Sequence, residues 1–203
     1  PRAARELIAG MTVLPEAEWR HGEGLRRIVT ALSARGGAVK LVGGAVRDTL
    51  LGLPVADIDL ATPLMPDQVM QRLEKAGIKV VPTGIAHGTV TVVIGKEPFE
   101  VTTLRQDVET YGRHAKVAFG RDWAGDAHRR DFTINALSVT ADGAVHDYTG
   151  GLDDLAARRV RFIGEARTRI EEDYLRILRF FRFHAAYGRG EPDRDGLHAC
   201  IEG

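Results

Sequence analysis

The sequence predicts an α+β fold, in which a mixed, mostly antiparallel sheet flanked by helices is followed by an all-helical segment. Two observations lead to this fold class. Short runs of β-branched residues, such as residues 89–94, are bounded by glycine or proline and have strand character. Between them lie segments whose apolar residues recur with the period of an α-helix, and the strongest of these, residues 169–187, comes last.

The first half of the chain is expected to alternate helices and strands. Residues 24–35 carry apolar side chains at helical spacing and precede a pair of glycines, so we expect a helix there. The next elements are a strand at 39–42, a short helical turn at 44–51, a helix at 66–76, and strands at 80–81, 89–94 and 99–104. The last two strands are separated by turn-forming residues and are expected to pair as an antiparallel hairpin.

The second half begins with a polar stretch. Residues 106–125 are polar and contain glycine, which predicts a mobile loop. Two short strands, 138–140 and 144–146, surround Asp142-Gly143, a strong hairpin signal. We therefore expect a loop and then a second hairpin in this region.

A hinge and a short helix are expected next. Gly150 and Gly151 form the expected hinge. Asp153 and Asp154 fall in the first turn of the helix that follows, where a negative charge favours the helix dipole, and we interpret them as capping residues. The final expected elements are a strand at 159–163 and a single helix at 169–187.

These elements divide the chain into three parts. They are an N-terminal extension, residues 1–23, an α/β head domain, residues 24–164, and the start of a helical neck domain, residues 165–203. The chain ends soon after its most periodic helix. We therefore expect the neck domain, and most of any RNA-holding surface, to continue beyond residue 203.

Composition excludes several classes of protein. With 44% hydrophobic and 28% charged residues, the chain has the composition of a water-soluble globular protein. No apolar run approaches the ~20 residues of a membrane span, and the N-terminus lacks the apolar core of a signal peptide. The single cysteine, Cys200, excludes an internal disulfide and fits a reducing cytoplasm. Basic and acidic residues are equal in number, which argues against a large nucleic-acid-binding surface within these residues.

The first motif is the segment 41–62, which reads LVGGAVRDTLLGLPVADIDLAT. Gly43 and Gly44 follow an apolar strand, and paired glycines at such a place let the backbone approach a ligand closely. The helix start that follows suits an anion such as phosphate. Arg47 adds a fixed positive charge with a forked set of donors. This half of the segment therefore suits a phosphate group.

Two acids supply the second half of this segment. Asp57 and Asp59 are two residues apart, so in a strand they face the same side, while Ile58 faces the core. Two carboxylates this close repel each other unless a cation lies between them. Mg²⁺ takes hard oxygen ligands and shares its shell with substrate phosphates, so the acids are candidate Mg²⁺ ligands. Each half has a simpler reading, because a glycine pair alone is a turn and an acid pair is often a solvated strand end.

The order GGAVRD, LLGLP and DID resembles the signature of the class II tRNA nucleotidyltransferase and bacterial poly(A) polymerase family. The resemblance implies a head with a DNA polymerase β-like fold. It also implies that Asp57 and Asp59 hold the catalytic metals, and that Gly43, Gly44 and Arg47 hold the incoming triphosphate. In such folds a third carboxylate often comes from a neighbouring strand. Here that would be Glu100, whose alternative is a solvated or salt-bridged strand residue.

A second motif, RRDFTINAL at 129–137, resembles another signature of the same family. By this resemblance Arg130 contacts the nucleotide. Asp131 and Asn135 either bond the ribose hydroxyls or brace the arginine, since carboxylate and amide oxygens accept from O–H groups. From its residues alone, the motif could equally be a capped helix start.

A third signature, EEDYLRILRFFRF, lies in the last predicted helix. A carboxylate at Asp173 can accept from the exocyclic amino group of cytosine or adenine, and Arg176 can donate to the adjacent ring acceptor. Uracil and guanine present a carbonyl instead, which leaves the carboxylate unpaired at a cost of order 1–3 kcal/mol. Arg179 and Arg182 would orient Arg176 or touch phosphate. The alternative is a solvated charged face.

Together the motifs predict a template-independent, Mg²⁺-dependent nucleotidyltransferase. It would add nucleotides from CTP and ATP to the 3′ end of tRNA, with no membrane partner. Within the same family, a poly(A) polymerase using ATP alone, or an enzyme adding only CC or only A, is the alternative. A nucleotide-binding module without catalysis is a third reading, which the presence of both acids and both arginine motifs disfavours.

Overall fold

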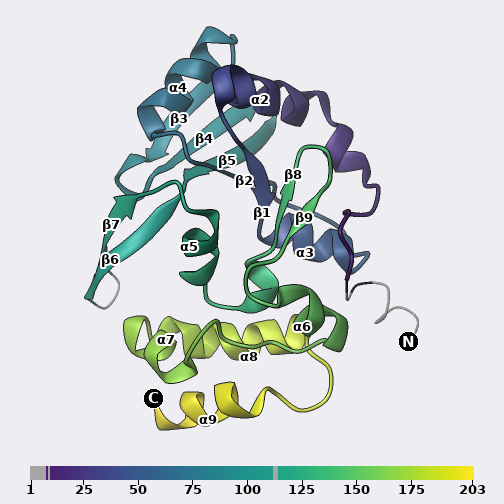
Figure 1. The fold of residues 1–203 in the computed structure, drawn as a ribbon, viewed down its shortest axis with the longest axis vertical. Coiled ribbons are helices and arrows are strands. Elements are labelled where there is room, and N and C mark those ends of the chain that lie inside the picture. Colours follow the sequence, from purple (N-terminus) through teal and green to yellow (C-terminus); the bar gives the residue numbers. More distant parts are fainter. Residues whose placement is uncertain (1–7, 9, 112–113) are drawn as a thin grey trace.

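The computed structural model describes residue 8, residues 10–111 and residues 114–203 (Figure 1). Short 3-10 turns connect several of the regular elements, and four are η1 (Glu18–His21), η2 (Ala34–Gly36), η3 (Ile85–His87) and η4 (Thr133–Asn135). No helix in the described ranges has the length and apolarity that a membrane crossing requires.

A seven-stranded sheet forms the centre of the head. Its strands are β1 (Lys40–Val42), β2 (Asp59–Thr62), β3 (Lys79–Gly84), β4 (Thr89–Ile94), β5 (Glu97–Thr103), β8 (Ser138–Thr140) and β9 (Val145–His146). They lie in the order β3-β4-β5-β2-β1-β8-β9, and the pair β2–β5 is parallel whereas the other pairs are antiparallel. The predicted mixed, mostly antiparallel sheet and the β4–β5 hairpin are therefore confirmed.

Two helices cover one face of this sheet. They are α2 (Glu23–Ser33) and α4 (Pro66–Lys75), at the upper end in Figure 1. Ile28 and Leu73, both fully buried, belong to one hydrophobic core with strand residues such as Leu60 and Val92. Side chains alternate between faces along a strand, so Asp59, which precedes Leu60, points to the face that these helices leave open.

The other helices lie at the opposite end of the molecule or beside the open face. They are α3 (Gly44–Leu50), α5 (Trp123–His128), α6 (Gly151–Ala157), α7 (Ala166–Glu172), α8 (Leu175–Tyr187) and α9 (Arg194–Glu202). Figure 1 shows α7, α8 and α9 gathered below the sheet, with α5 between them and the sheet. The region predicted to begin a neck domain is thus helical from Ala166 onward.

The N-terminal extension packs on the head. Leu14 is 2% exposed and belongs to the main core, and Val13 forms a bridge with Ala144 beside β9. The Trp19 indole donates to Thr49 Oγ1 at 3.0 Å. The described part of the extension is therefore anchored to both the sheet and α3.

The stretch 106–125 does not form the predicted loop. It contains β6 (Arg105–Tyr111) and β7 (His114–Phe119), which pair in a two-stranded antiparallel sheet, and then the start of α5. Ladder hydrogen bonds satisfy the backbone of such a ribbon without requiring apolar residues, so polar composition alone does not distinguish it from a loop.

The strand predicted at 159–163 is also absent from the sheet. Phe162 forms an isolated bridge with Phe132, and the Ile163 amide donates to the Asp131 carbonyl at 3.0 Å. This segment therefore runs along the second motif instead of extending the sheet. Its bridge partner, Phe132, lies outside the strands of the sheet.

The helix predicted at 169–187 is two helices. The chain is extended at Asp173, with φ −157° and ψ 106°, and the Asp173 carboxylate accepts from the Leu175 amide at 3.1 Å at the start of α8. The sequence predicts one buried apolar face along a single helix, and this prediction is wrong because the helix is interrupted at Asp173. Ile170, before the break, is buried, whereas Leu178, after it, is 68% exposed.

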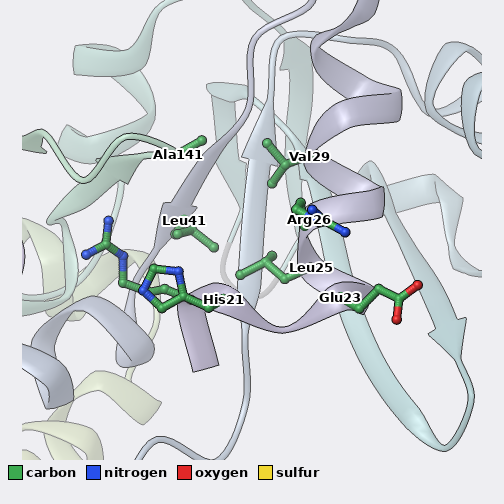
Figure 2. Close-up of a pocket in the computed structure, with 8 residues that line it drawn as sticks. His21, Glu23, Leu25, Arg26, Val29, Leu41 and Ala141 are labelled. Atoms are coloured by element: carbon green, nitrogen blue, oxygen red, sulfur yellow. The ribbon is translucent and has the colours of Figure 1, made fainter. Parts of the chain in front are cut away.

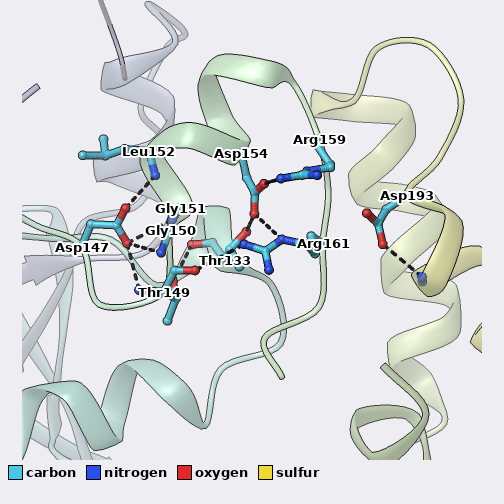
Figure 3. Close-up of polar contacts among 11 residues, drawn as sticks. Thr133, Asp147, Thr149, Gly150, Gly151, Leu152, Asp154, Arg159, Arg161 and Asp193 are labelled. Carbon is cyan, nitrogen blue, oxygen red and sulfur yellow. Dashed lines mark hydrogen bonds and ion pairs between the residues drawn. The ribbon is translucent and has the colours of Figure 1, made fainter. Parts of the chain in front are cut away.

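The interpretation of Asp153 and Asp154 as helix caps is wrong, and Figure 3 shows why. Asp147 performs the capping, because its carboxylate accepts from four backbone amides at 2.9–3.0 Å, those of Thr149, Gly150, Gly151 and Leu152. Asp153 is exposed, and Asp154 is fully buried.

Asp154 joins the second motif to the segment that follows α6. Its carboxylate accepts from Thr133 Oγ1 at 2.7 Å, from Arg159 Nε at 2.7 Å and from Arg161 Nε at 2.8 Å (Figure 3). This fully buried carboxylate forms a structural ion pair, and losing it would leave the buried Thr133 hydroxyl without an acceptor, whereas the Arg159 and Arg161 side chains, 48% and 40% exposed, could turn to water.

We expect Asp154→Ala to lower the free energy of unfolding by about 1–3 kcal/mol, the usual cost of leaving a buried hydrogen-bonding group, here the Thr133 hydroxyl, without its partner. Urea denaturation followed by circular dichroism measures this. The matched control is Asp153→Ala, one residue away and exposed, which should change stability by less than about 0.5 kcal/mol. Equal effects for the two variants would contradict the assignment of Asp154.

Candidate active site

The glycine turn after β1 lies beside the second motif and one of the acids. Gly43 has φ 70° and ψ −129°, a conformation that residues with a side chain rarely adopt. A Cβ built on Gly43 would lie 3.6 Å from Arg130 Nη1 and 3.9 Å from Asp59 Oδ2. Residues from three separate segments therefore meet at Gly43, where no side chain covers the backbone.

The three candidate acids gather on the open face of the sheet. Asp59 is the first residue of β2, and its register partner on the parallel strand β5 is Glu100. Asp57 precedes the strand, so the predicted strand geometry holds for Asp59 but not for Asp57. Asp57 and Glu100 are exposed, whereas Asp59 is half-buried. Of the two readings of Glu100, its place beside Asp59 favours a third carboxylate of the site, and its role in metal binding stays a prediction.

Electrostatics set Asp59 apart from ordinary carboxylates. Burial raises the pKa of Asp59, the negative charges of Glu100 and Asp57 raise it further, and Arg130 opposes the shift. Within the described ranges, no three acidic, imidazole or thiol groups are already gathered tightly enough to hold a metal. The donor set nevertheless fits a hard divalent cation that draws its other ligands from water and phosphate.

Arg47 lies in the protein interior, only 6% exposed. Its guanidinium donates to both oxygens of Asp48 at 2.8 and 3.0 Å, to Asn135 Oδ1 at 2.6 Å and to the Tyr187 hydroxyl at 2.6 Å. These bonds engage all three guanidinium nitrogens. The geometry thus favours a bracing role for Arg47, and contact with a triphosphate stays a prediction.

Asp131 and Asn135 form the next part of this network. Asn135 Nδ2 donates to Asp131 Oδ1 at 3.3 Å, and Asp131 Oδ2 accepts from Arg179 Nε at 2.7 Å. Neither side chain braces Arg130, the arginine of their own motif, and both bond arginines of other motifs instead, while contact with the ribose stays a prediction. The arginines are Arg47 and Arg179, which belong to the first and third motifs.

Arg130 takes a different position, at the edge of the acid site. Its Nη2 lies 3.2 Å from Asp126 Oδ2, and its Nη1 donates to the Asn135 carbonyl at 3.3 Å. Asp126 is a site residue that sequence reasoning missed. Burial would raise the pKa of Asp126, but Arg129 and Arg130 together hold that pKa below its ordinary value. The available signal was the i, i+3 and i+4 spacing of Asp126, which lies on α5, and the two arginines that directly follow this helix.

The candidate base-reading residues lie around the break between α7 and α8. Arg176 Nη1 donates to the Arg169 carbonyl at 2.7 Å and to Glu172 Oε2 at 2.5 Å. The Arg176 side chain is therefore paired with Glu172 and not with Asp173, the other residue expected to read the base. Arg182 is exposed and lies 5.8 Å from the Phe183 ring.

Phe183 and Tyr187 are the other residues that sequence reasoning missed. The Arg47 guanidinium carbon lies 3.9 Å from the Tyr187 ring centroid and 5.4 Å from that of Phe183, and Arg179 lies 5.3 Å from Phe183. These aromatic rings on α8 separate and hold the two cations. Their four-residue spacing was visible in the sequence, but their partners were not.

A surface hollow elsewhere on the head is not this site. It has a volume of about 420 Å³ and is lined by η1 and α2 together with Leu41 and Ala141 (Figure 2). Leu41 alternates with Val42, the register partner of Asp59, so the hollow lies on the opposite side of the sheet from the acids.

Residues 39–161 match the family described as the poly A polymerase head domain. The chain belongs to this family. The match covers the glycine turn, the acids and the second motif, and it confirms the resemblance and the predicted fold class of the head. The third signature lies beyond the matched residues.

Three similar proteins extend the comparison to the helical part. The chain is 45% identical over 194 residues to CCA tRNA nucleotidyltransferase 1, mitochondrial, of Mus musculus, covering 93% of the chain and 44% of the mouse protein. A crystal structure of the Bacillus stearothermophilus CCA-adding enzyme in complex with CTP is similar with a TM-score of 0.78 and 34% identity, covering 89% of the chain and 44% of that protein. A tRNA nucleotidyltransferase complexed with a primer tRNA and an incoming ATP analog has a TM-score of 0.70 and 28% identity, covering 86% and 49%.

The chain thus spans less than half the length of each of these relatives. The similarity to each continues past residue 161, because at least 86% of the chain is covered. The part of the chain that follows the matched head residues is therefore also similar, at least in part, to these three proteins.

We expect Asp59→Asn to stabilise this family member when divalent cations are removed. The folded-state pKa of Asp59 is raised, so the ionised carboxylate opposes folding at neutral pH, and this cost disappears as pH falls below the ordinary aspartate range. In EDTA the melting temperature of the variant should exceed that of wild type at pH 7–8, and the difference should vanish near pH 3.

Mg²⁺ should raise the melting temperature of wild type and leave that of Asp59→Asn nearly unchanged, since a ligand stabilises only the state that binds it. Glu97→Gln is the matched control, because Glu97 is exposed on β5 three residues from Glu100 and faces the other side. A variant less stable than wild type in EDTA at neutral pH would contradict the account of Asp59.

Proposed function

We propose that the chain is the catalytic head and first neck helices of a metal-dependent enzyme that adds CTP- and ATP-derived nucleotides to the 3′ end of tRNA. The observation that carries this proposal is that Asp59 and Arg130 meet at the backbone of Gly43, with Glu100 beside Asp59 on the neighbouring strand. The site pairs a carboxylate cluster with an adjacent guanidinium, which suits a metal–triphosphate complex.

The relatives support the choice of substrate. The mouse relative is named as a CCA tRNA nucleotidyltransferase, and the two solved relatives were crystallised with CTP or with a primer tRNA and an ATP analog. Carried over to this chain, these names favour CTP, ATP and tRNA as its substrates. The neutral charge of the chain leaves most of the tRNA contacts to other parts of the protein.

In the proposed reaction the RNA 3′ oxygen attacks the α-phosphorus, and the bond to pyrophosphate breaks. Asp57 and Asp59, with Glu100 as a third candidate, would hold Mg²⁺. Bound Mg²⁺ would lower the pKa of the attacking hydroxyl and neutralise charge on the leaving pyrophosphate. The open backbone at Gly43 lets the triphosphate approach, and Arg130 lies where it can balance negative charge.

Base selection would fall to Asp173 and Arg176. Asp173 accepts from an exocyclic amino group and Arg176 donates to the neighbouring ring atom, which suits cytosine and adenine. Arg176 pairs with Glu172 in this structure, so it would exchange that partner for the base. Glu172 and the Arg169 carbonyl would hold the arginine until the nucleotide arrives.

A poly(A) polymerase that uses ATP alone is the second candidate, because the family description itself names that activity. An enzyme that adds only CC or only A is a further alternative within the same family. A non-catalytic nucleotide-binding module is disfavoured, because the carboxylates expected to hold metal are present and adjacent.

The proposal includes a reducing compartment. Cys200 is free and buried, and burial raises the pKa of its thiol to about 11, so it is a poor nucleophile at neutral pH. A cytoplasmic location fits this chemistry. The name of the mouse relative places that protein in mitochondria.

We expect Asp59→Ala to reduce incorporation of labelled CTP or ATP into tRNA lacking its 3′ end by at least about 10³-fold, because the charge that develops on phosphate loses its counter-ion. Binding of the nucleotide should persist in part, measured by isothermal titration. Asp67→Ala, an exposed acid on α4, is the control and should remain fully active. Full activity of Asp59→Ala would overturn the metal assignment.

Arg176→Ala should relax base choice more than it weakens triphosphate binding. A good bidentate contact gives about 1–3 kcal/mol of discrimination, so the preference for CTP over UTP should fall by roughly 10–100-fold. Competition among the four nucleotides, using the full-length protein, measures this. The control is Arg167→Ala, an exposed arginine on α7. Unchanged competition would refute base reading by Arg176.

A further inference from the structure

Tyr187, the last residue of α8, makes two contacts with the buried cation of the first motif. Its hydroxyl accepts a hydrogen bond from Arg47 Nη2 at 2.6 Å, and its ring centroid lies 3.9 Å from the guanidinium carbon. Arg47 is 6% exposed, so both contacts are shielded from water. They join residues 140 positions apart in the sequence.

A second contact joins the same helix to the second motif. Arg179, one turn into α8, pairs with Asp131 through its Nε at 2.7 Å. Arg179 and Tyr187 are eight residues apart, or about 12 Å along a helix. Phe180, next to Arg179, is fully buried in the core, so apolar packing and the Asp131 contact hold this part of α8, and the Tyr187 contact adds a separate attachment at its C-terminal end.

The candidate base readers lie at the opposite end of α8 from Tyr187. Arg176 precedes Tyr187 by eleven residues, which is about 16 Å of helix. A rotation of α8 about the Arg179–Asp131 pair would therefore move Arg176 relative to the glycine turn, where the triphosphate is proposed to bind. Tyr187 is the residue that opposes this rotation from the far end.

We propose that Tyr187 is a positioning residue for base selection, which it achieves by locking the C-terminal end of α8 onto Arg47. The inference rests on the proposed function, because base selection has meaning only for a nucleotidyltransferase. It adds a residue outside the three motifs, and it makes nucleotide choice depend on a contact between the end of α8 and α3.

The contact can be weakened in two steps without removing the charge partners of Arg47. Tyr187→Phe removes the hydroxyl and keeps the ring, which also packs on Phe183 at a centroid distance of 5.5 Å. Arg47 keeps its bonds to Asp48 and Asn135, so this variant should fold. Tyr187→Leu removes the ring as well.

The experiment uses the full-length protein and measures kcat/KM for each of the four nucleoside triphosphates on tRNA lacking its 3′ end. We expect Tyr187→Phe to lower the preference for CTP over UTP, and for ATP over GTP, by about tenfold. Tyr187→Leu should lower both preferences further. The KM for inorganic pyrophosphate in the reverse reaction should stay within about twofold of wild type, because the triphosphate site is left intact.

Tyr148→Phe is the matched control. The Tyr148 hydroxyl also accepts from a buried cation, Lys40, at 3.2 Å, but this contact does not involve α8. Its removal should lower the melting temperature while leaving both preferences unchanged. Equal loss of preference in Tyr148→Phe and Tyr187→Phe would reduce the effect of Tyr187 to general stability and overturn the inference.

A double-mutant cycle separates this inference from the proposed function. Arg47→Lys and Tyr187→Phe should change the melting temperature non-additively, since each removes part of the same contact. Additive changes, or preferences in Tyr187→Phe equal to those of an active wild type, would refute the role of Tyr187. A wild-type protein that incorporates no nucleotide would instead refute the proposed function.

Discussion

The buried guanidinium of Arg47 is the constraint on which the rest of the site depends. A charge removed from water needs several hydrogen-bonding partners, and it finds them in Asp48, Asn135 and Tyr187. These partners come from α3, the second motif and the end of α8. The buried Arg47 therefore lacks its full set of partners until the other two regions have docked on it, so folding of the head also positions α8.

The acidic residues differ from Arg47, because the charges around them do not fully compensate their own. Asp59 and its neighbours are kept close although burial and like charge make ionisation unfavourable, and Arg130 relieves only part of that cost. Such a site is stabilised by a cation and is strained without one. The sheet supplies the necessary rigidity, because parallel pairing of β2 with β5 fixes Asp59 beside Glu100 in register, while the α2 and α4 side of the sheet carries the core.

Aromatic packing connects these two polar regions. Phe132, within the second motif, lies 5.3 Å from Phe183 and 4.9 Å from Phe162 between ring centroids. The segment 159–163, which the sequence suggested as a sheet strand, instead holds Phe162 in this cluster and directs Arg161 to Asp154. Apolar contacts thus fix the spacing between α8 and the head, and the Asp131–Arg179 ion pair and the Arg47–Tyr187 hydrogen bond fix the orientation of α8.

The sequence by itself determined the mixed sheet, most of its strands and the motifs, because strand and helix periods and glycine turns are local properties. It also placed Asp57 and Asp59 together, since they are two residues apart. Only the tertiary structure decided the partners of Arg47 and Asp131, the break at Asp173 and the pairing of β6 with β7. Those depend on contacts between distant residues, such as Arg47 and Tyr187, which exist only once the helices have packed and excluded water from the cations between them.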